Sequence, residues 1–316
     1  MELITKEQLK NLSAGQKING IILVKDYSIQ LTKTNKEYVA GTLQSGADIY
    51  FKSWGSSPAF SKFKLEDYKN IPAYIVGSVD DYGGSNSIIV ESVQAVEGYT
   101  PDQFYPIKYN IDAYWSALKG QIDKRVSDKG KNICDSILFN NEELSNRFKN
   151  EFAAKSHHDN CKGGLLAHTY KVLNNIANIV TMYPALVTRE NEVDSDFIDL
   201  LYIGALLHDI GKTVEMEFGV YQPKSIVTHN YLGLEFIESY KSLIIESYNE
   251  TWYYNLVSIL LQHHGDYEAP CRTLASFIVH RADEFDATMT LLCQQVESVN
   301  NASGERIKFD NKYLVI

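Results

Sequence analysis

The stretch Ala205-Leu-Leu-His208-Asp209-Ile-Gly-Lys212 ends an apolar run that begins near Phe197, and it places a histidine directly before an aspartate. This pair offers one neutral nitrogen and one carboxylate oxygen, a mixed donor set suited to a divalent transition metal. Adjacent residues on a helix point about 100° apart, so two such side chains cannot close a metal site alone. We therefore expect further ligands from other segments of the chain.

The composition is that of an ordinary globular chain with about two domains. It has 316 residues, of which 44% are hydrophobic and 22% charged. The net charge is -10, and because residues 1–106 hold 10 basic and 12 acidic residues, most of the excess negative charge lies beyond them. A protein with a pI near 5.3 is not an obvious nucleic-acid binder, because attraction to phosphate usually needs a basic surface. A nucleic acid would have to be held by a local patch, by aromatic stacking or by metal ions.

Cysteine usage and hydropathy bear on the compartment. The four cysteines Cys134, Cys161, Cys271 and Cys293 form no CxxC pair, and the first residues lack the basic and apolar regions of a signal peptide. No apolar run reaches the roughly 18 residues of a membrane span. These features predict a reduced, cytoplasmic protein without a membrane partner, and they are compatible with a homo-oligomer.

The N-terminal part of the sequence is predicted to form β structure. Short β-branched and aromatic runs separated by polar turns predict strands at 18–24, 38–43, 48–54, 73–78 and 87–96. Five such runs within about 80 residues indicate a small barrel, for which an OB-fold is the commonest cytoplasmic form. We expect this domain, with its linker, to span residues 1–106.

Aromatic residues on the second and third expected strands suggest a binding face. Tyr38, Tyr50, Phe51 and Trp54 could stack on the bases of a single-stranded nucleic acid, with Lys36 and Lys52 near the phosphates. The alternative is that these aromatics belong to the barrel core or are exposed strand residues, because strands favour aromatic side chains in any case.

After the linker, residues 97–107, the hydrophobic period changes from two to 3.6, which predicts an all-α domain over residues 107–316. The expected helices are 112–126, 131–138, 142–154, 165–182 and 197–212, followed by three helices capped by Thr228, Thr251 and Thr273, with a short strand within 306–316. The fold class is thus α+β multidomain, a small OB-fold-like barrel followed by a helical domain. All eight histidines lie between positions 157 and 280, so the chemistry belongs to the second domain.

Polar residues interrupt the apolar faces of these expected helices at His168, His208-Asp209, His229, His263-His264 and Asp283. A buried imidazole or carboxylate without a partner is costly, so each of them needs an explanation. Taken singly, a histidine on an apolar face is more often a hydrogen-bonded core residue, and a lone aspartate is usually solvated. The complete order H…HD…H…HH…D on separate helices instead indicates a metal centre.

Here the sequence resembles the HD-domain metal-dependent phosphohydrolases, whose central motif is close to the segment 205–212 quoted above. More narrowly, it is similar to the YhaM-type 3'-5' exoribonucleases through Ala154-Lys-Ser-His157-His158, Gly163-Gly-Leu-Leu-Ala-His168-Thr, Gln262-His-His-Gly265 and Asp283-Glu-Phe-Asp286-Ala. Those proteins join an N-terminal OB-fold to a C-terminal HD domain at about this length. The resemblance is strong from about 150 to 290 and weak before 107.

The resemblance implies a role for each matching position. His168, His208, Asp209 and Asp283 would form the shared metal site, whereas His229 and His263, with His264 in addition, would support a second metal. Asp209 and Lys212 would be catalytic, with Lys212 meeting a phosphate oxygen or orienting the nucleophilic water. The alternative for Lys212 is a solvated cation at the end of a helix.

Other matching residues are assigned to the surroundings of the metals. His157 and His158 would lie at the mouth of the cleft, either in contact with substrate or at the plain surface, and Arg272 would meet phosphate or solvent. His280 and Asp286 would support the metal ligands from behind. The mixed nitrogen and oxygen donors favour one or two ions of manganese, or of iron or cobalt, over magnesium.

The leading hypothesis is a metal-dependent 3'-5' exonuclease that shortens single-stranded RNA, or else DNA, by metal-activated water. An HD-type phosphodiesterase of cyclic or small nucleotides is the alternative, since paired histidines like His263-His264 occur in cyclic-dinucleotide phosphodiesterases of the superfamily. Those enzymes carry a Gly-Tyr-Pro signature, whereas this chain has Gly265-Asp-Tyr-Glu-Ala-Pro270. A third hypothesis is a non-catalytic OB-type binding module with a structural metal.

Overall fold

The computed structural model describes residues 2–82, 85–155, 159–299, 306–310 and 312–315. The chain divides into two compact units, Met1–Lys108 and Tyr109–Ile316, and each unit has its own hydrophobic core. None of the helices in the described part of the chain combines the length and apolar character needed to cross a membrane.

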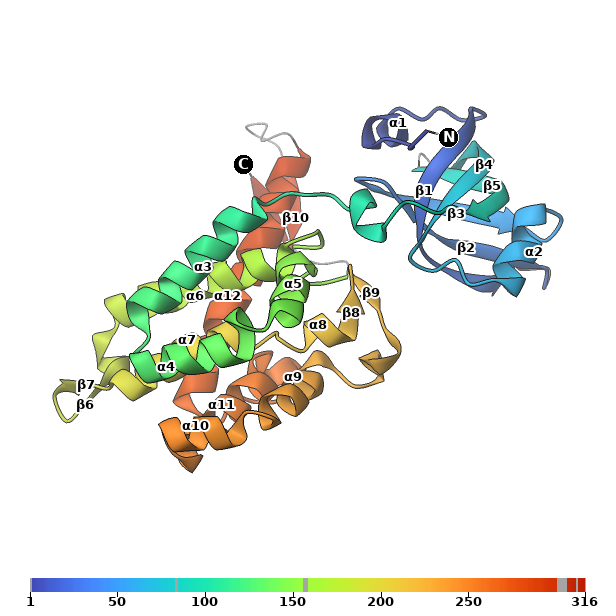
Figure 1. The fold of residues 1–316 in the computed structure, drawn as a ribbon. Helices are drawn as coiled ribbons and strands as arrows, with labels where there is room; N and C mark the ends of the chain where they lie inside the picture. The colour runs from blue at the N-terminus through green and yellow to red at the C-terminus, as the bar shows by residue number, and fades with distance from the viewer. Residues whose placement is uncertain (1, 83–84, 156–158, 300–305, 311, 316) are drawn as a thin grey trace. The chain divides into compact units, whose positions relative to one another are not determined.

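The first unit is a closed five-stranded barrel, as predicted (Figure 1). Its strands join in the order β1-β2-β3-β5-β4, with β3 and β5 paired in parallel and all other neighbours antiparallel. The elements are α1 Lys6–Lys10, β1 Lys17–Leu31, β2 Glu37–Gln44, β3 Asp48–Trp54, α2 Pro58–Leu65, β4 Ile71–Tyr82 and β5 Ser85–Ala95.

Strand β1 is twice as long as the apolar run that predicted it, because it pairs with β4 through its first half and with β2 through its second half. The register shifts between Val24 and Asp26, and such a bulge bends a strand and increases its twist. Because of this bend, β1 can pair with both β4 and β2, and this pairing closes the barrel. Helix α2, which the sequence did not predict, begins at the N-cap Ser57 and packs the buried ring of Phe63 against Phe51 in the barrel core.

The second unit is helical, as predicted, and carries three two-stranded hairpins in addition. Its helices are α3 Ile111–Arg125, α4 Asp128–Cys134, α5 Glu142–Asn150, α6 Gly164–Met182, α7 Ser195–Leu207, α8 Lys212–Glu215, α9 His229–Glu238, α10 Lys241–Ser247, α11 Glu250–Gln262 and α12 Leu274–Ser298. The hairpins are β6 Thr188–Arg189 with β7 Glu192–Val193, β8 Met216–Glu217 with β9 Val220–Tyr221, and β10 Arg306–Phe309 with β11 Lys312–Val315.

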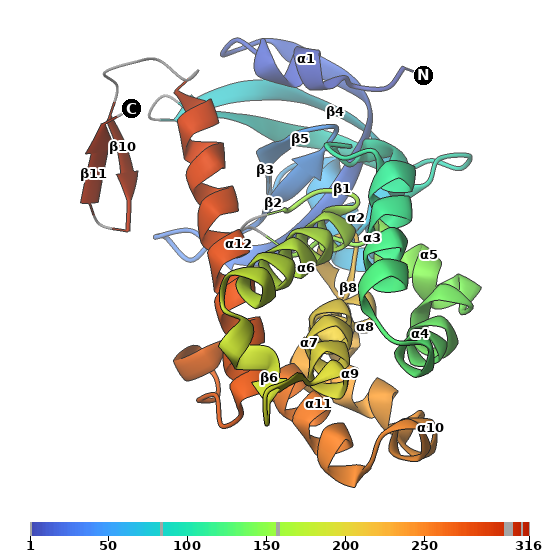
Figure 2. The same ribbon diagram turned by 90° about the vertical axis from the view of Figure 1, so that its left-hand side faces the viewer.

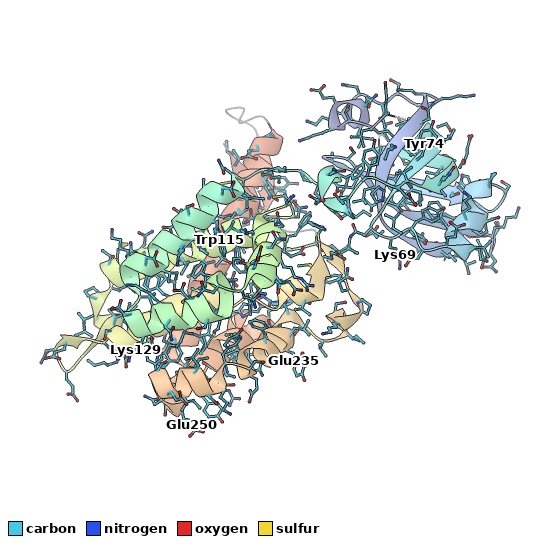
Figure 3. All side chains as sticks on the ribbon, in the orientation of Figure 1. Lys69, Tyr74, Trp115, Lys129, Glu235 and Glu250 are labelled. Carbon is cyan, nitrogen blue, oxygen red and sulfur yellow. The ribbon has the colours of Figure 1, made fainter. Side chains whose placement is uncertain are left out.

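Helix α7 is the centre of this unit, with a run of buried residues from Asp199 to Leu207. A helix that is apolar on all sides must be covered on all sides, and α6, α11 and α12 pack against it (Figures 1 and 2). Trp115 on α3, labelled in Figure 3, packs against the rings of Phe139 and Phe148 and extends the core toward α5.

The prediction of one helix over 197–212 is wrong at its C-terminal end. Helix α7 stops at Leu207, and the chain continues through tight turns in which Ile210 N–H donates to the carbonyl of Leu207 and Lys212 N–H to that of Asp209. A Cβ at Gly211 would collide with the carbonyl of His229, so glycine permits the close approach of the α9 backbone. The turn therefore brings Asp209 and His229 together.

The predicted N-cap Thr251 is also wrong, because the side chain of Asn249 accepts a hydrogen bond of 2.8 Å from Trp252 N–H and starts α11 two residues earlier. That helix ends at Gln262, and Gly265 in the turn after it has a φ of +62°. The predicted cap at Thr273 is confirmed, with a capping box to Ser276.

Candidate metal centre

Six of the predicted ligands come from five helices and the turn after α7, and all six are buried. His208 and His263 are the C-cap residues that directly follow α7 and α11, and His229 is the first residue of α9. The remaining ligands are His168 on α6, Asp283 on α12 and Asp209 in the turn. Helix ends are turned inward at three of these positions, so the cluster lies where several helices meet.

The first half of the cluster is formed around the Nε2 atom of His168. This atom lies 3.1 Å from Oδ1 of Asp283, 3.2 Å from Nε2 of His208 and 3.5 Å from Oδ2 of Asp209. The Nε2 atom of His208 is in turn 3.3 Å from the same oxygen of Asp209. Two imidazoles and two carboxylates thus face one small volume, as the sequence order suggested.

The second half is formed around the other oxygen of Asp209. Its Oδ1 atom lies 3.3 Å from Nε2 of His229 and 3.5 Å from Nε2 of His263. His264 joins these three residues with a ligand atom that lies within 4.8 Å of theirs. The single carboxylate of Asp209 therefore presents one oxygen to each group of histidines.

Three of these atoms provide a test of whether the residues fit a metal ion. Oδ1 of Asp209, Nε2 of His229 and Nε2 of His263 are buried, yet none of them has a hydrogen-bond partner among the described residues. Buried polar atoms are normally satisfied by hydrogen bonds. Converging donors of this kind, with free lone pairs and no proton between them, fit a divalent cation.

The outer nitrogens of the histidines show how the rings are held. Nδ1 of His168 lies 2.7 Å from Oδ2 of Asp286, and Nδ1 of His229 lies 3.2 Å from Oε2 of Glu215. A carboxylate on one ring nitrogen fixes the proton there and leaves the other nitrogen free to bind metal. Glu215 was missed in the sequence, because a lone glutamate in a four-residue helix has no recognisable signature.

Backbone carbonyls hold the other two buried histidines. Nδ1 of His208 donates to the carbonyl of Ala205 at 2.8 Å, and Nδ1 of His263 donates to that of Leu260 at 3.0 Å. These carbonyls are available because the last turn of a helix leaves its acceptors without intrahelical partners. Each half of the cluster thus contains one histidine held by a carboxylate and one held by a helix end.

The carboxylates in the cluster are kept ionised by their neighbours. Burial acts to raise the pKa of Asp209, but the ammonium group of Lys212 and the imidazoles that face the carboxylate hold it well below its ordinary value. The pKa of Asp283 is likewise lowered, against the effect of burial, by His168. Both side chains are therefore available as anionic ligands.

The pKa values of His263 and His168 are shifted in opposite directions. Burial lowers the pKa of His263 to about 3, so its imidazole is neutral and ready to bind a cation. Burial acts in the same direction on His168, but hydrogen bonds and charges from Asp283, Asp286 and Asp209 outweigh it and raise the pKa to about 10. Metal binding at His168 would displace a proton from the side of the ring that faces Asp283.

Lys212 is not a solvated cation. Only 8% of the residue is exposed, and its Nζ atom lies 2.7 Å from Oδ2 of Asp209. The ammonium group consequently sits at the edge of the first half of the cluster, where it offsets the negative charge of the shared carboxylate.

His280 and Glu268 contact the two histidines of the Gln262-His-His-Gly265 segment. His280, which was expected to support the metal ligands, donates from Nδ1 to the carbonyl of His263 at 2.7 Å and so braces the turn after α11. The ring of His280 leaves no room for a Cβ at Gly265. His264 is half-buried, and its Nδ1 atom lies 3.1 Å from Oε1 of Glu268, a second carboxylate that the sequence did not reveal.

Among the contacts of the described residues, none brings Arg272 into the cluster. Arg272 is exposed, and its backbone N–H donates to the side chain of Gln262. His157 and His158 lie outside the described residues.

The barrel carries an aromatic surface on β2 and β3. Tyr50 and Trp54 are 43% and 40% exposed, and Lys52 lies 5.8 and 5.9 Å from the centres of their rings. The rings of Tyr38 and Trp54 are 5.2 Å apart. Phe51, in contrast, is fully buried in the core, so its predicted part in a stacking face is wrong: it points to the opposite side of β3.

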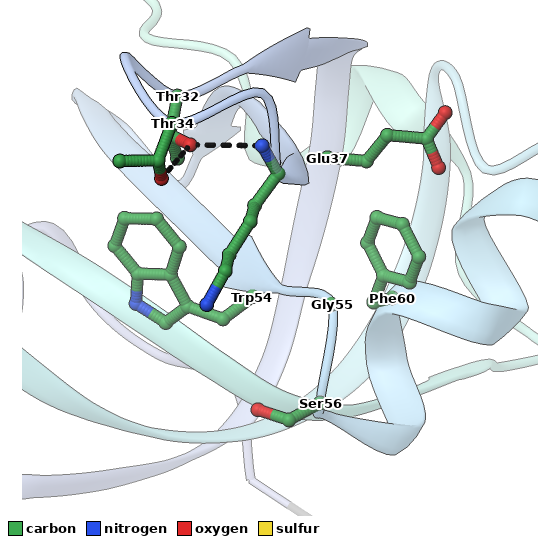
Figure 4. A pocket seen from close by; sticks show the side chains of 8 residues that line it. Thr32, Thr34, Glu37, Trp54, Gly55, Ser56 and Phe60 are labelled. Atoms are coloured by element: carbon green, nitrogen blue, oxygen red, sulfur yellow. Dashed lines mark hydrogen bonds between the residues drawn. The ribbon is translucent and has the colours of Figure 1, made fainter.

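A pocket of about 560 Å³ opens beside this aromatic surface (Figure 4). The side chains of Trp54 and Phe60 form two of its walls, and Lys36 is also one of the residues that line it. The turn between β1 and β2 contributes Thr32 and Thr34.

Residues 165–288 match the model of the HD domain family, so the second unit contains an HD domain and the expected resemblance is confirmed. The chain is similar to the 3'-5' exoribonuclease YhaM of Bacillus velezensis, with 25% identity over 90% of this chain and 89% of that protein. The YhaM of Bacillus subtilis also shows 25% identity, with the same coverage. Among solved structures, the yeast mitochondrial single-stranded DNA binding protein Rim1 matches 27% of this chain and 96% of its own, at 11% identity and a TM-score of 0.23.

Proposed function

We propose that this protein is a metal-dependent phosphodiesterase, and specifically a 3'-5' exonuclease that hydrolyses single-stranded RNA, with DNA as the weaker substrate. In this proposal residues 107–316 form the hydrolytic domain, and residues 1–106 form a domain that binds the nucleic acid.

The observation that carries the proposal is the position of Asp209. Its two oxygens face two separate groups of buried donors, His168, His208 and Asp283 on one side and His229, His263 and His264 on the other. A carboxylate shared in this way is suited to a pair of divalent ions, and paired ions serve phosphodiester hydrolysis by generating a hydroxide nucleophile and by stabilising the leaving oxygen. The nitrogen-rich donor set favours manganese, or iron or cobalt, over magnesium.

The protein's own residues would then act mainly by position and charge. The imidazoles are held in one tautomer by Asp286, Glu215 and two helix ends. The ammonium group of Lys212 would be shared between Asp209 and a phosphate oxygen of the substrate, and it would stabilise the charge that builds up on that oxygen. Phosphoryl transfer needs no nucleophilic serine or cysteine in this arrangement.

The barrel supports a polymeric substrate over a small one. Tyr50, Trp54 and the adjacent pocket offer exposed rings on which unpaired bases can stack, with Lys36 and Lys52 for the phosphates. The similarity to proteins named 3'-5' exoribonuclease extends over 90% of the chain and so includes the barrel. A phosphodiesterase of cyclic nucleotides would have no evident use for this surface.

Digestion of a 20-nucleotide RNA labelled at either end, in the presence of Mn²⁺, tests the proposal. We expect 5'-labelled RNA to yield a ladder of shortened products and 3'-labelled RNA to release labelled mononucleotide at once, and we expect the His208→Ala, Asp209→Ala double variant to do neither. Cleavage of cyclic nucleotides with intact RNA would favour the small-substrate alternative. Bound metal without any turnover would favour a binding module with a structural metal.

A further inference from the structure

Behind His168 lies a second group of buried charges that the metal cluster does not account for. Asp159, Asp286 and His168 have ligand atoms close enough together for a metal ion. The ammonium group of Lys171 already occupies this place, because its Nζ atom lies 2.7 Å from Oδ2 of Asp159 and 3.3 Å from Oδ1 of Asp286.

The ammonium group of Lys171 has three polar neighbours. It donates hydrogen bonds to Oδ2 of Asp159 and, at 2.8 Å, to Oγ1 of Thr290, and it forms an ion pair with Asp286. Thr290 donates in turn to Oδ1 of Asp286 at 3.3 Å. The oxygen of Asp286 that does not face His168 is thus fixed from two directions.

The far end of this group is held as firmly as the near end. The side chain of Asp159 is completely buried, and its Oδ1 atom accepts a hydrogen bond from the hydroxyl of Tyr109. Asp159 belongs to the loop before α6 and has a positive φ of 51°, a conformation that non-glycine residues rarely adopt. In this conformation of the loop, the carboxylate of Asp159 lies against the ammonium group of Lys171.

The helical spacing explains why these residues lie directly behind the metal ligands. His168 and Lys171 are three residues apart on α6, and Asp283 and Asp286 are three residues apart on α12, so each helix presents one residue to the metal cluster and one to the charges behind it. The two helices pack side by side, as Figures 1 and 2 show.

We propose that Lys171 and Asp159 are positioning residues for the metal ligand His168. Lys171 holds Asp286, Asp286 holds the Nδ1 proton of His168, and the Nε2 lone pair is thereby aimed at the first metal position. Asp159 and Tyr109 keep the ammonium group of Lys171 in place. This inference rests on the proposed function. It adds that the affinity for the metal bound by His168 depends on residues that do not themselves contact a metal.

The test is a titration of the full-length, metal-stripped protein with Mn²⁺, followed by calorimetry and by the electron paramagnetic resonance of bound Mn²⁺. Lys171→Met and Asp159→Asn are compared with the double variant that carries both changes. The two single changes alter the local charge in opposite directions, and the double variant restores it. Lys119→Met is the matched control, because Lys119 also lies between two aspartates, at 3.7 and 3.2 Å, but far along the chain from any predicted ligand.

If the residues act by position, both single variants and the double variant lower the affinity of one Mn²⁺ by about ten-fold or more, as supporting residues of metal ligands commonly do. The other Mn²⁺ and the Lys119→Met control stay within two-fold of the wild type, and Lys171→Arg recovers most of the loss. Should a variant fail to fold, Tyr109→Phe removes only one hydroxyl without a change of charge and is expected to weaken the same Mn²⁺ several-fold.

Two results would overturn the inference. In the first, Lys171→Met tightens and Asp159→Asn weakens the binding of Mn²⁺ while the double variant matches the wild type, which means that only net charge matters. In the second, neither affinity changes in any variant. A wild-type protein that binds no Mn²⁺ at all would instead overturn the proposed function itself, so the two failures are distinguishable.

Discussion

Oε2 of Glu215 lies 3.2 Å from Nδ1 of His229, while Nε2 of the same ring faces Oδ1 of Asp209 at 3.3 Å. The Glu215 carboxylate also accepts the backbone N–H of His229 through Oε1 at 3.2 Å. One buried glutamate thus fixes both the ring and the start of α9. The half of the cluster that contains His229 depends on this residue as the other half depends on Asp286.

We predict that Glu215→Gln weakens the binding of one of two Mn²⁺ ions by about 10- to 100-fold, because an amide cannot hold the Nδ1 proton as a carboxylate does. Calorimetric titration of metal-stripped protein measures this loss. Glu217→Gln, a change of an exposed glutamate two residues away, is the control and should bind Mn²⁺ like the wild type. Equal affinities in Glu215→Gln and the control would show that the contact has no part in metal binding.

The role of Lys212 can be separated from that of the metal ligands. Replacement by methionine removes the ammonium group near Asp209 but no ligand, so we expect kcat on RNA to fall by about 100-fold or more while both Mn²⁺ ions remain bound. Single-turnover kinetics at saturating RNA, together with metal analysis of the same sample, measures both quantities. If metal is lost along with activity, Lys212 serves only to hold Asp209 and does not meet the substrate.

Glu151 gives a pH dependence of stability that is independent of the metal ligands. Its carboxylate is buried and accepts the backbone N–H groups of Phe152, Phe218 and Gly219, which ties α5 to the turn of the β8-β9 hairpin. Burial raises its pKa from the ordinary 4.5 to about 7, against the effect of these three hydrogen bonds. A pKa that is higher in the folded chain stabilises the fold fully below pH 4.5, and this contribution is lost as the pH rises through 7.

We therefore expect the free energy of unfolding of Glu151→Gln minus that of the wild type to rise by about 3 kcal/mol between pH 4 and pH 8. Groups that titrate in the same way in both proteins make no contribution to the difference between their free energies of unfolding. Urea unfolding at closely spaced pH values measures it, with the exposed Glu246→Gln as a matched control. A difference that stays constant over this range would contradict the assignment of a raised pKa to Glu151.

Much of the fold could be predicted from the sequence, because its signals are local. Alternation along β2 and β3 gave both strands nearly to the residue, and the apolar run before His208 gave the central helix α7. The errors come from contacts between segments. Helix α7 stops at Leu207 because the α9 backbone approaches Gly211, and β1 extends to Leu31 because two different neighbours pair with its two halves.

The metal ligands could be proposed from sequence because histidine and aspartate on apolar faces stand out, but the residues that support them could not. The supporting residues are of types that usually lie at the surface: Glu215, Lys171 and Asp159. Only the packing of α6 against α12 and the turn at Gly211 buries them. That the two oxygens of Asp209 face different histidines could likewise be seen only in the three-dimensional structure.

The barrel can be tested apart from hydrolysis. Trp54→Ala removes an exposed ring that can stack on a base, which is worth about 1 to 3 kcal/mol, so we expect single-stranded RNA to bind about 10- to 100-fold more weakly. Fluorescence anisotropy in the presence of a chelator measures binding without cleavage. Tyr313→Ala, which removes an exposed ring from the C-terminal hairpin, is the control. An equal effect of both changes would show that the β3 surface is not the binding face.

Anomalous X-ray diffraction from crystals soaked in Mn²⁺ tests most directly whether the carboxylate of Asp209 is shared by two cations. We predict two anomalous peaks, one next to each oxygen of Asp209, at the separation of roughly 3.5–4 Å that is usual for two-metal hydrolytic sites. The first peak should contact His168, His208 and Asp283, and the second His229 and His263. Peaks that lie elsewhere, or no peak beside Asp209, would contradict the account.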